Sequence, residues 1–260
     1  MSVQQKDFVI TGSVILPSGS CLMTLVPADG ALLPECHPGQ FVQIKVDNAS
    51  TFLRRPISIC DVRNGRELIL FIKPVGDGSR HLCAMKPGEK LNIIIPLGHG
   101  FTCGDDVNGK KVLLVGGGVG AAPLVNLSRR LAGCGADVTV AIGGRSKSDI
   151  EGVTDLYEFA SRIAVSTDDG SEGEHGVITQ NTVFRQQFDR IYCCGPTPMM
   201  KAVARVARQN ATWCEVSLEN SMACGVGACL CCVQETSDHG NVCVCTEGPV
   251  FNINRLESWI

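Results

Sequence analysis

The sequence lacks the features that would indicate a membrane or a nucleic acid as its main partner. It contains no uninterrupted apolar run approaching the roughly 18 residues of a membrane-spanning helix. Its formal net charge is −3 and no block of basic residues occurs, which argues against nucleic acid or an anionic membrane surface. The N-terminal stretch includes Gln4, Gln5, Lys6 and Asp7 and no apolar core of signal-peptide length. We therefore expect a cytoplasmic protein.

The composition leaves room for more than one domain. The chain has 260 residues, of which 44% are hydrophobic and 19% are charged. These values are typical of a globular protein with a substantial core. The length suits two domains of ordinary size, or two domains with a small appendage.

Cysteine usage is the unusual feature of the composition. There are 15 cysteines, an odd number, and a disulfide framework would need an oxidising compartment that the chain has no evident signal to reach. Nine of them occur singly or as the Cys193-Cys194 pair and fit the role of small buried hydrophobic residues. The other six lie between positions 224 and 245. That density indicates a metal site.

The hydrophobic pattern changes twice along the chain. In residues 1–105, short apolar runs such as 41–46 and 68–72 alternate with turn signals such as Pro38-Gly39 and Asn64-Gly65, which predicts an antiparallel β-barrel. In residues 106–212, apolar runs at 112–115, 138–142, 163–165 and 190–194 alternate with helical stretches at 123–131, 156–160 and 198–208. This alternation predicts a doubly wound, parallel α/β domain. The cysteine-rich residues 213–260 are expected to form a small third domain.

The cysteine-rich segment has the spacing of an iron–sulfur site. Three cysteines follow the pattern C-x4-C-x2-C, and a fourth comes after a further twelve residues. This is the plant-type [2Fe–2S] arrangement with a distant fourth ligand. Gly225 and Gly227 would let the loop wrap closely around the cluster and turn backbone N–H groups toward its sulfurs. The predicted ligands are Cys224, Cys229, Cys232 and Cys245.

A zinc site of the CxxC…CxC kind is the main alternative for these cysteines. It would use positions 229, 232, 243 and 245, and it would leave Cys224 and the glycine loop unexplained. The remaining pair, Cys231 and Cys243, are expected to be non-ligands. From the spacing alone, however, Cys243 could replace Cys245.

The barrel region contains a weak flavin signal. The run Arg54-Arg55-Pro56-Ile57-Ser58 begins an expected strand, from which Arg55 could face a pyrophosphate and the Ser58 hydroxyl could bond to a flavin ring. Further on, Lys73 and Gly78-Ser79 could surround the same phosphates with a cation, a backbone N–H and a hydroxyl. A helix expected from residue 79 would begin there, with its N-terminus toward the anion.

The α/β region contains a nucleotide signal. Gly116-Gly117-Gly118-Val119-Gly120 follows a strand and opens a helix, as phosphate-binding turns do, although a plain tight turn would look the same. Cys194-Gly195-Pro196 ends another strand at the same edge of the sheet, where ligands of open α/β sheets bind. The predicted nucleotide contacts are Gly116, Gly117, Gly118, Gly120, Cys194, Gly195 and Pro196.

The order of these motifs resembles that of the ferredoxin–NADP reductase superfamily. The whole chain is similar to one branch, the electron-transfer subunits of class 1B dihydroorotate dehydrogenase. The resemblance is carried by residues 53–59 (LRRPISI), 96–101 (PLGHGF), 116–123, 222–229 (MACGVGAC) and 245–251 (CTEGPVF). In that branch the fourth ligand stands two residues ahead of Gly-Pro-Val-Phe, which identifies Cys245 rather than Cys243.

The resemblance implies a set of cofactors and a partner. Electrons would pass from the FMN of a partner catalytic subunit that oxidises dihydroorotate to the [2Fe–2S] cluster, then to FAD and to NAD⁺, in a heterotetramer with two copies of each subunit. Ile57 stands where many members have a tyrosine that packs on the flavin ring. The implied FAD contacts are Arg55, Pro56, Ile57, Ser58, Phe71, Ile72, Lys73, Gly78 and Ser79.

Two alternatives remain open from the sequence. Arg145 and Lys147, just after the second expected strand of the α/β domain, would suit the 2′-phosphate of NADP, although the resembling family mostly uses NAD, which we therefore expect. The chain could also be the flavin and iron–sulfur subunit of another complex, such as a ferredoxin:NADP oxidoreductase, a sulfide dehydrogenase or a hydrogenase. A zinc-stabilised adaptor without enzymatic activity is the alternative from a different class.

Overall fold

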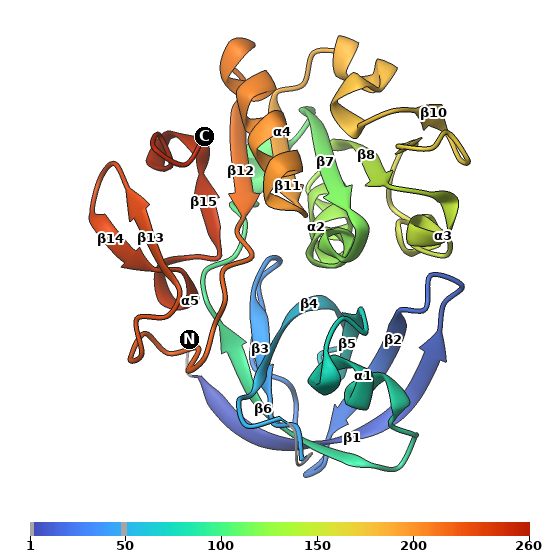
Figure 1. The fold of residues 1–260 in the computed structure, drawn as a ribbon, viewed down its shortest axis with the longest axis vertical. Coiled ribbons are helices and arrows are strands. Elements are labelled where there is room, and N and C mark those ends of the chain that lie inside the picture. Colours follow the sequence, from blue (N-terminus) through green and yellow to red (C-terminus); the bar gives the residue numbers. More distant parts are fainter. Residues whose placement is uncertain (1–2, 48–50) are drawn as a thin grey trace.

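A closed barrel, a seven-stranded sheet and a C-terminal segment make up the structure (Figure 1). The computed structural model describes residues 3–47 and 51–260. In Figure 1 the barrel lies below the sheet, and the C-terminal segment, in orange and red, lies on the left beside both. The barrel and the doubly wound sheet predicted from the sequence are therefore confirmed.

The barrel follows the strand order β1-β2-β5-β4-β3-β6 with antiparallel neighbours. Its interior is filled from alternate positions: Val42 and Ile44 point inward, whereas Phe41 and Gln43 on the same strand are buried outside the barrel. The outer face of β3 is therefore covered by another part of the chain. The elements are β1 (Gln4–Ile15), β2 (Cys21–Pro27), β3 (Phe41–Ile44), β4 (Arg55–Arg63), β5 (Glu67–Ile72), α1 (Asp77–Ala84) and β6 (Lys90–Leu97).

The second sheet has the order β10-β9-β8-β7-β11-β12-β15, in which all neighbours but the last pair are parallel. Its central strands are continuous apolar runs because both faces are covered. On β7, Leu113 and Val115 face one core while Val112 and Leu114 face the other. The strands are β7 (Lys111–Gly117), β8 (Asp137–Gly144), β9 (Arg162–Thr167), β10 (Glu174–His175), β11 (Arg190–Cys194), β12 (Trp213–Ser217) and β15 (Val250–Asn252).

Helices cover both faces of this sheet. Helix α2 (Ala122–Gly133) packs between the sheet and β4 of the barrel, and α4 (Thr197–Gln209) covers the opposite face beside β12, while α3 (Lys147–Ile150) follows β8. The helix expected at 156–160 is wrong: a 3₁₀ turn at Thr154–Leu156 ends at Tyr157, which is held out of helical geometry because its buried hydroxyl donates to the Ala121 carbonyl at 2.6 Å. No helix in the described residues is long and apolar enough to cross a membrane.

The C-terminal segment shares its core with the α/β sheet. Cys232, Val244 and Cys245 pack in the same hydrophobic cluster as Val216 and Phe251 of β12 and β15. The segment holds the hairpin β13 (Val233–Thr236) and β14 (Gly240–Cys243), followed by α5 (Val244–Glu247). Although a boundary at residue 213 is expected from the sequence, β12 and β15 belong to the sheet. The three-domain division stays a prediction.

The linker between barrel and sheet is held by a buried acid. Glu215 accepts hydrogen bonds from the Thr102 backbone N–H at 2.9 Å and from its hydroxyl at 2.7 Å. The Tyr192 hydroxyl donates to the Thr102 carbonyl at 2.8 Å, so all three polar groups of Thr102 are satisfied. Burial raises the pKa of Glu215. This network fixes the linker against two strands of the sheet.

Glu215→Ala should lower the free energy of unfolding by about 1–3 kcal/mol, because it removes the buried carboxylate that accepts two hydrogen bonds from Thr102. Urea unfolding followed by circular dichroism would measure the change. Glu158→Ala, which removes an exposed acid, is the matched control and should change stability little. Equal stability of the two variants would contradict the role given to Glu215.

Candidate functional site

Most of the residues expected to bind the flavin border one cavity between the barrel and the α/β sheet. Its volume is about 440 Å³. Ile72 is the exception, since it is fully buried in the barrel core. The expected residues that line the cavity are Arg55, Pro56, Ile57, Ser58, Phe71, Lys73, Gly78 and Ser79, joined by Gly120 and Cys194 from the sheet.

Arg55 lies directly against the start of α1. A Cβ atom added to Gly78 would lie 2.5 Å from Arg55 Nε and 3.2 Å from the Thr51 methyl group. Any larger residue at position 78 would therefore displace the guanidinium. The arrangement places the only charge of the R-P-I-S motif beside the backbone N–H groups of a helix N-terminus, which is a combination suited to a phosphate.

The Ser79 hydroxyl serves the helix rather than the cavity. Its Oγ accepts from the backbone N–H groups of Val75 and Gly76 at 2.9 and 3.0 Å and donates to the Gly76 carbonyl at 3.0 Å. Ser79 thus shapes the turn that precedes α1. The sequence placed a hydroxyl at the phosphates here, but these three bonds use its hydrogen-bonding capacity within the turn.

A second cavity of about 430 Å³ lies at the carboxyl edge of the parallel strands. Gly117, Gly118 and Pro196 line it, as expected, whereas Gly116 and Gly195 do not. Apart from Lys73 and Arg145, the sequence did not indicate the other lining residues, because they come from separate strand ends that only the sheet brings together. They include Gly143, Gly144, Asp149, Asp168, Ile178 and Met199.

The glycines of the two turns allow their backbones to touch. A Cβ atom on Gly120 would lie 2.5 Å from the Gly195 Cα and 2.6 Å from the Cys194 carbonyl oxygen. One on Gly117 would lie 2.8 Å from the Pro196 ring. The Gly120 contacts are with backbone atoms and that of Gly117 with a rigid ring, beside the flexible Met199 side chain at 2.7 Å, so a side chain at either position would collide with the other turn. The glycine turn and the Cys-Gly-Pro turn form one joint wall between the two cavities.

The basic residues of the second cavity are paired with acids. Asp149 lies 3.4 Å from Arg145 Nε and 3.3 Å from Lys73 Nζ, which reaches across from the barrel. The pKa of Asp149 is lowered by these cations in spite of the opposing effect of burial. Lys147 lies 3.3 Å from Glu172. The charges that could have received a 2′-phosphate are thus engaged with carboxylates, and Lys73 lines both cavities.

Backbone N–H groups of the cysteine loop point at three of the four predicted ligand sulfurs. The N–H of Val226 donates to Cys224 Sγ at 3.4 Å, and that of Gly227 donates to Cys245 Sγ at 3.2 Å. The N–H of Cys245 donates to Cys232 Sγ at 3.4 Å. Bonds of this kind stabilise thiolates; the Val226 N–H is the main cause that lowers the pKa of Cys224 to about 6.

The two glycines of the loop are required by its geometry. Gly225 and Gly227 have φ of 72° and 80°, a region that residues with a Cβ rarely adopt. A Cβ atom on Gly225 would lie 2.8 Å from Gln43 Cγ of the barrel, and one on Gly227 would lie 3.0 Å from the Thr246 methyl group. The loop therefore turns tightly and contacts β3 through Gly225 and Gln43.

The two extra cysteines differ in position. Cys231 is exposed, whereas Cys243 is half-buried with its thiol 3.8 Å from the Gly227 carbonyl oxygen. Burial raises the pKa of Cys243, and nearby thiols, chiefly that of Cys232, raise it further. All 15 cysteines are free of disulfides. Of the nine outside the cluster segment, five are buried and four are half-buried, as expected for small apolar residues.

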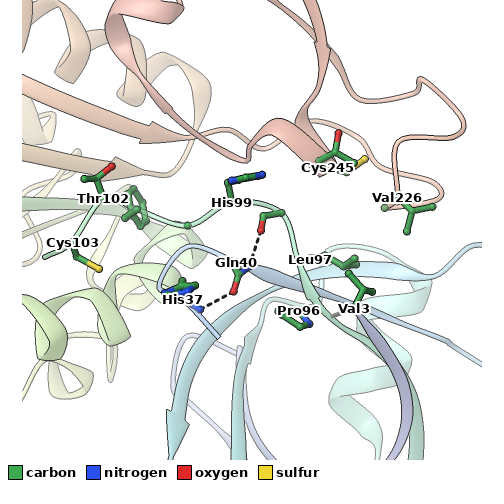
Figure 2. Close-up of a pocket in the computed structure, with 15 residues that line it drawn as sticks. Val3, His37, Gln40, Pro96, Leu97, His99, Thr102, Cys103, Val226 and Cys245 are labelled. Atoms are coloured by element: carbon green, nitrogen blue, oxygen red, sulfur yellow. Dashed lines mark hydrogen bonds between the residues drawn. The ribbon is translucent and has the colours of Figure 1, made fainter. Parts of the chain in front are cut away.

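A third cavity, of about 690 Å³, lies between the cysteine segment, the barrel and the linker at residues 98–103 (Figure 2). Figure 2 shows Val226 and Cys245 on one side of it, and Val3, Pro96 and Leu97 on the barrel side. Sequence reasoning did not indicate this cavity, because its wall combines the barrel, the linker and the C-terminal segment.

The cysteine segment also borders the flavin cavity from both ends. Met222, two residues before Cys224, and Pro249, four residues after Cys245, both line it. Both belong to motifs that carry the family resemblance, but the sequence did not place them or their neighbours at the flavin cavity. Among them Glu219 is an acid whose pKa is raised by burial. The further lining residues include Val119, Ser217, Leu218, Glu219 and Asn220.

The donor set suits an iron–sulfur cluster. Four thiols lie on one glycine loop and one following turn, and amide N–H groups point at their sulfurs, as cluster loops require. In the described residues, no three His, Cys, Asp or Glu side chains are already arranged to hold a single metal ion. The fit therefore depends on the chemistry of the thiols and the N–H groups around them.

A family model matches the C-terminal part of the chain. Residues 219–257 match the iron-sulfur cluster binding domain of dihydroorotate dehydrogenase B. The match spans all four predicted ligands and the hairpin between them.

Solved structures share the fold. A structure of the NADH-dependent reduced ferredoxin–NADP oxidoreductase, described for flavin-based electron bifurcation, superposes with a TM-score of 0.84 at 28% identity, covering 96% of this chain and 89% of that one. Phthalate dioxygenase reductase, described as a modular structure for electron transfer from pyridine nucleotides to [2Fe–2S], superposes with a TM-score of 0.67 at 17% identity, covering 93% and 94%. The latter likeness concerns the fold alone.

Curated relatives match over most of the chain. The electron transfer subunit of dihydroorotate dehydrogenase B (NAD(+)) from Clostridium perfringens is 39% identical over 221 residues, covering 85% of this chain and 87% of the relative. Its counterpart from Bacillus velezensis is 40% identical over 229 residues, covering 85% and 87%. With identity of this extent across the barrel, the sheet and the cysteine segment, the chain belongs to the family of electron transfer subunits of dihydroorotate dehydrogenase B.

Proposed function

We propose that this chain carries electrons from a dihydroorotate-oxidising partner subunit to NAD⁺, with a [2Fe–2S] cluster on the cysteine loop and FAD in the 440 Å³ cavity. The observation that carries the proposal is the shared wall of the two sites: Met222 and Pro249 line the flavin cavity and flank the ligands Cys224 and Cys245. Two residues of chain span at most about 7 Å. The Cα atom of the first ligand, Cys224, therefore lies within about 7 Å of that of Met222, which lines the flavin cavity.

The division of labour follows from the chemistry of the two groups. A bound flavin accepts single electrons and gives up a pair as hydride, which a one-electron cluster cannot do. The chain supplies their positions: Arg55 and the N-terminus of α1 would bind the pyrophosphate of FAD, and Ser58 would contact the flavin ring. The wall of Gly117, Gly120 and the Cys-Gly-Pro turn would separate flavin from nucleotide.

The proposed function also requires a partner subunit and an assembly with it. The relatives are named as electron transfer subunits of dihydroorotate dehydrogenase B, and such a subunit needs a catalytic partner. We expect the partner to carry FMN and to form a heterotetramer with two copies of each chain. A cytoplasmic location stays a prediction; fifteen unpaired cysteines fit a reducing compartment.

Anaerobic purification of the chain with a co-expressed dihydroorotate-oxidising subunit tests the function directly. The expected result is stoichiometric FAD, two irons per chain and reduction of NAD⁺ by dihydroorotate only when both subunits are present. The likeness to the ferredoxin–NADP oxidoreductase structure supports one competing function. Reduction by ferredoxin but not by dihydroorotate would favour that alternative.

Cys229→Ser should remove or destabilise the cluster while FAD stays bound, because it exchanges a thiolate ligand for a hydroxyl. Iron and acid-labile sulfide content, together with the electron paramagnetic resonance of the reduced protein, would measure the loss. Cys231→Ser is the matched control: its exposed thiol is two positions away and is expected to bind no iron. An unchanged cluster in Cys229→Ser would refute the ligand assignment.

Arg55→Ala should weaken FAD binding roughly tenfold to a hundredfold, because a charge-assisted pair with the pyrophosphate is worth about 1.5–3 kcal/mol. Flavin content after gel filtration and titration of the apoprotein would give the ratio. Arg63→Ala, at the exposed far end of the same strand, should keep its FAD. Full retention of FAD by Arg55→Ala would remove Arg55 from the site.

Asp149→Asn should shift nucleotide preference toward NADPH by about tenfold in the ratio of kcat/KM values, because it frees Arg145 to meet a 2′-phosphate. Rates of flavin reduction with NADH and NADPH would be compared. Glu151→Gln neutralises an exposed acid nearby and should leave the ratio unchanged. If both variants kept the preference for NADH, the Arg145–Asp149 pair would have no part in selecting the nucleotide.

A further inference from the structure

Gln43 is a fully buried amide whose side chain has no hydrogen-bond partner. Its exposed fraction is 0%, and both Nε2 and Oε1 are without a partner in the structure. Leaving such atoms unpaired is costly, so buried polar groups nearly always have a partner, a water or a ligand. The position therefore calls for a water or a bound group that the described protein atoms do not supply.

The strand register places this amide between the two cofactor sites. Gln43 pairs with Ile94 of β6 on one side and with Pro56 of β4 on the other, and Ile94 pairs in turn with Gln5 of β1. Directly opposed residues of neighbouring strands point to the same face, so these four form a row on the outside of the barrel. Gln5 ends the row in solvent, whereas Pro56 lines the flavin cavity.

The cluster loop lies on top of the amide. A Cβ atom on Gly225 would lie 3.0 Å from Gln43 Nε2 and 2.8 Å from its Cγ. Gly225 directly follows the ligand Cys224. The amide thus faces the one segment of the chain that is built to hold sulfur atoms.

Neighbouring polar groups do not satisfy the side chain. Arg54 donates to the backbone carbonyl of Gln43 at 3.3 Å and otherwise to Asn92, so the guanidinium is engaged away from the amide. Gln40, the other buried glutamine of this region, is satisfied by His37 and Gly98 at 2.7 Å each. Gln40 thus has a partner for each side-chain atom, whereas Gln43 has a partner for neither.

We propose that the Gln43 amide donates a hydrogen bond to a sulfur of the iron–sulfur cluster that the cysteine loop would hold. This inference rests on the proposed function, since it needs the cluster in the loop. An N–H donor stabilises the additional negative charge of the reduced cluster and so raises its reduction potential.

The test is the midpoint potential of the cluster in the full chain carrying FAD, measured by a redox titration followed by electron paramagnetic resonance. Gln43→Met keeps the length of the side chain and removes both polar atoms. We expect about a tenfold fall in the ratio of reduced to oxidised cluster at the wild-type midpoint, equal to about 59 mV for one electron. Gln5→Met makes the same exchange at the exposed end of the same row and should leave the potential unchanged.

A second measurement detects the amide directly in the wild-type protein. Glutamine labelled with ¹⁵N at the side-chain amide should give a hyperfine coupling to the reduced cluster in the wild-type protein, and Gln43→Met should lack it. A wild-type protein with an intact cluster, no such coupling and an unchanged Gln43→Met potential would overturn the inference alone. A properly reconstituted wild-type protein that holds no cluster would overturn the proposed function as well.

Discussion

The packing of the cysteine segment on the outer face of β3 is the constraint from which the arrangement of the sites follows. Phe41 on that face shares a core with Cys232 and Cys245, and Gly225 lies against the next outward residue. The adjacent strand β4 borders the flavin cavity. Neighbouring strands are about 4.8 Å apart, so the barrel itself sets the spacing between cluster loop and flavin cavity. A shift of the cysteine segment would therefore move the cluster loop away from the flavin cavity.

Close backbone contacts fix the position of the nucleotide cavity, as the packing on β3 fixes the position of the cluster loop. The glycine turn after β7 and the Cys-Gly-Pro turn after β11 touch without side chains between them, which keeps the wall between the cavities thin. Lys73 crosses from the barrel to Asp149 and joins the rims of both cavities. The same acid holds Arg145, so the charge balance of the nucleotide cavity depends on a contact between barrel and sheet.

Local motifs with a strong physical requirement could be predicted from sequence. The cysteine spacing and the glycine-rich turn are such motifs, and apolar runs such as 112–115 predicted strands because burial on both faces leaves no polar positions. Predictions failed where a distant contact decided: Tyr157 leaves the expected helix to reach Ala121, and Ile72 points into the barrel rather than the cavity. The Ser79 hydroxyl is likewise taken up by its own turn.

The sequence by itself determined the types of site, because ligand spacing, glycine turns and strand periodicity are local properties of the chain. It also determined the order barrel, α/β sheet and cysteine segment. Only the tertiary structure decided which residues face one another. That Gln43 lies under the cluster loop, that Met222 lines the flavin cavity and that Asp149 pairs with Lys73 all depend on contacts between segments far apart in sequence, which no local pattern encodes.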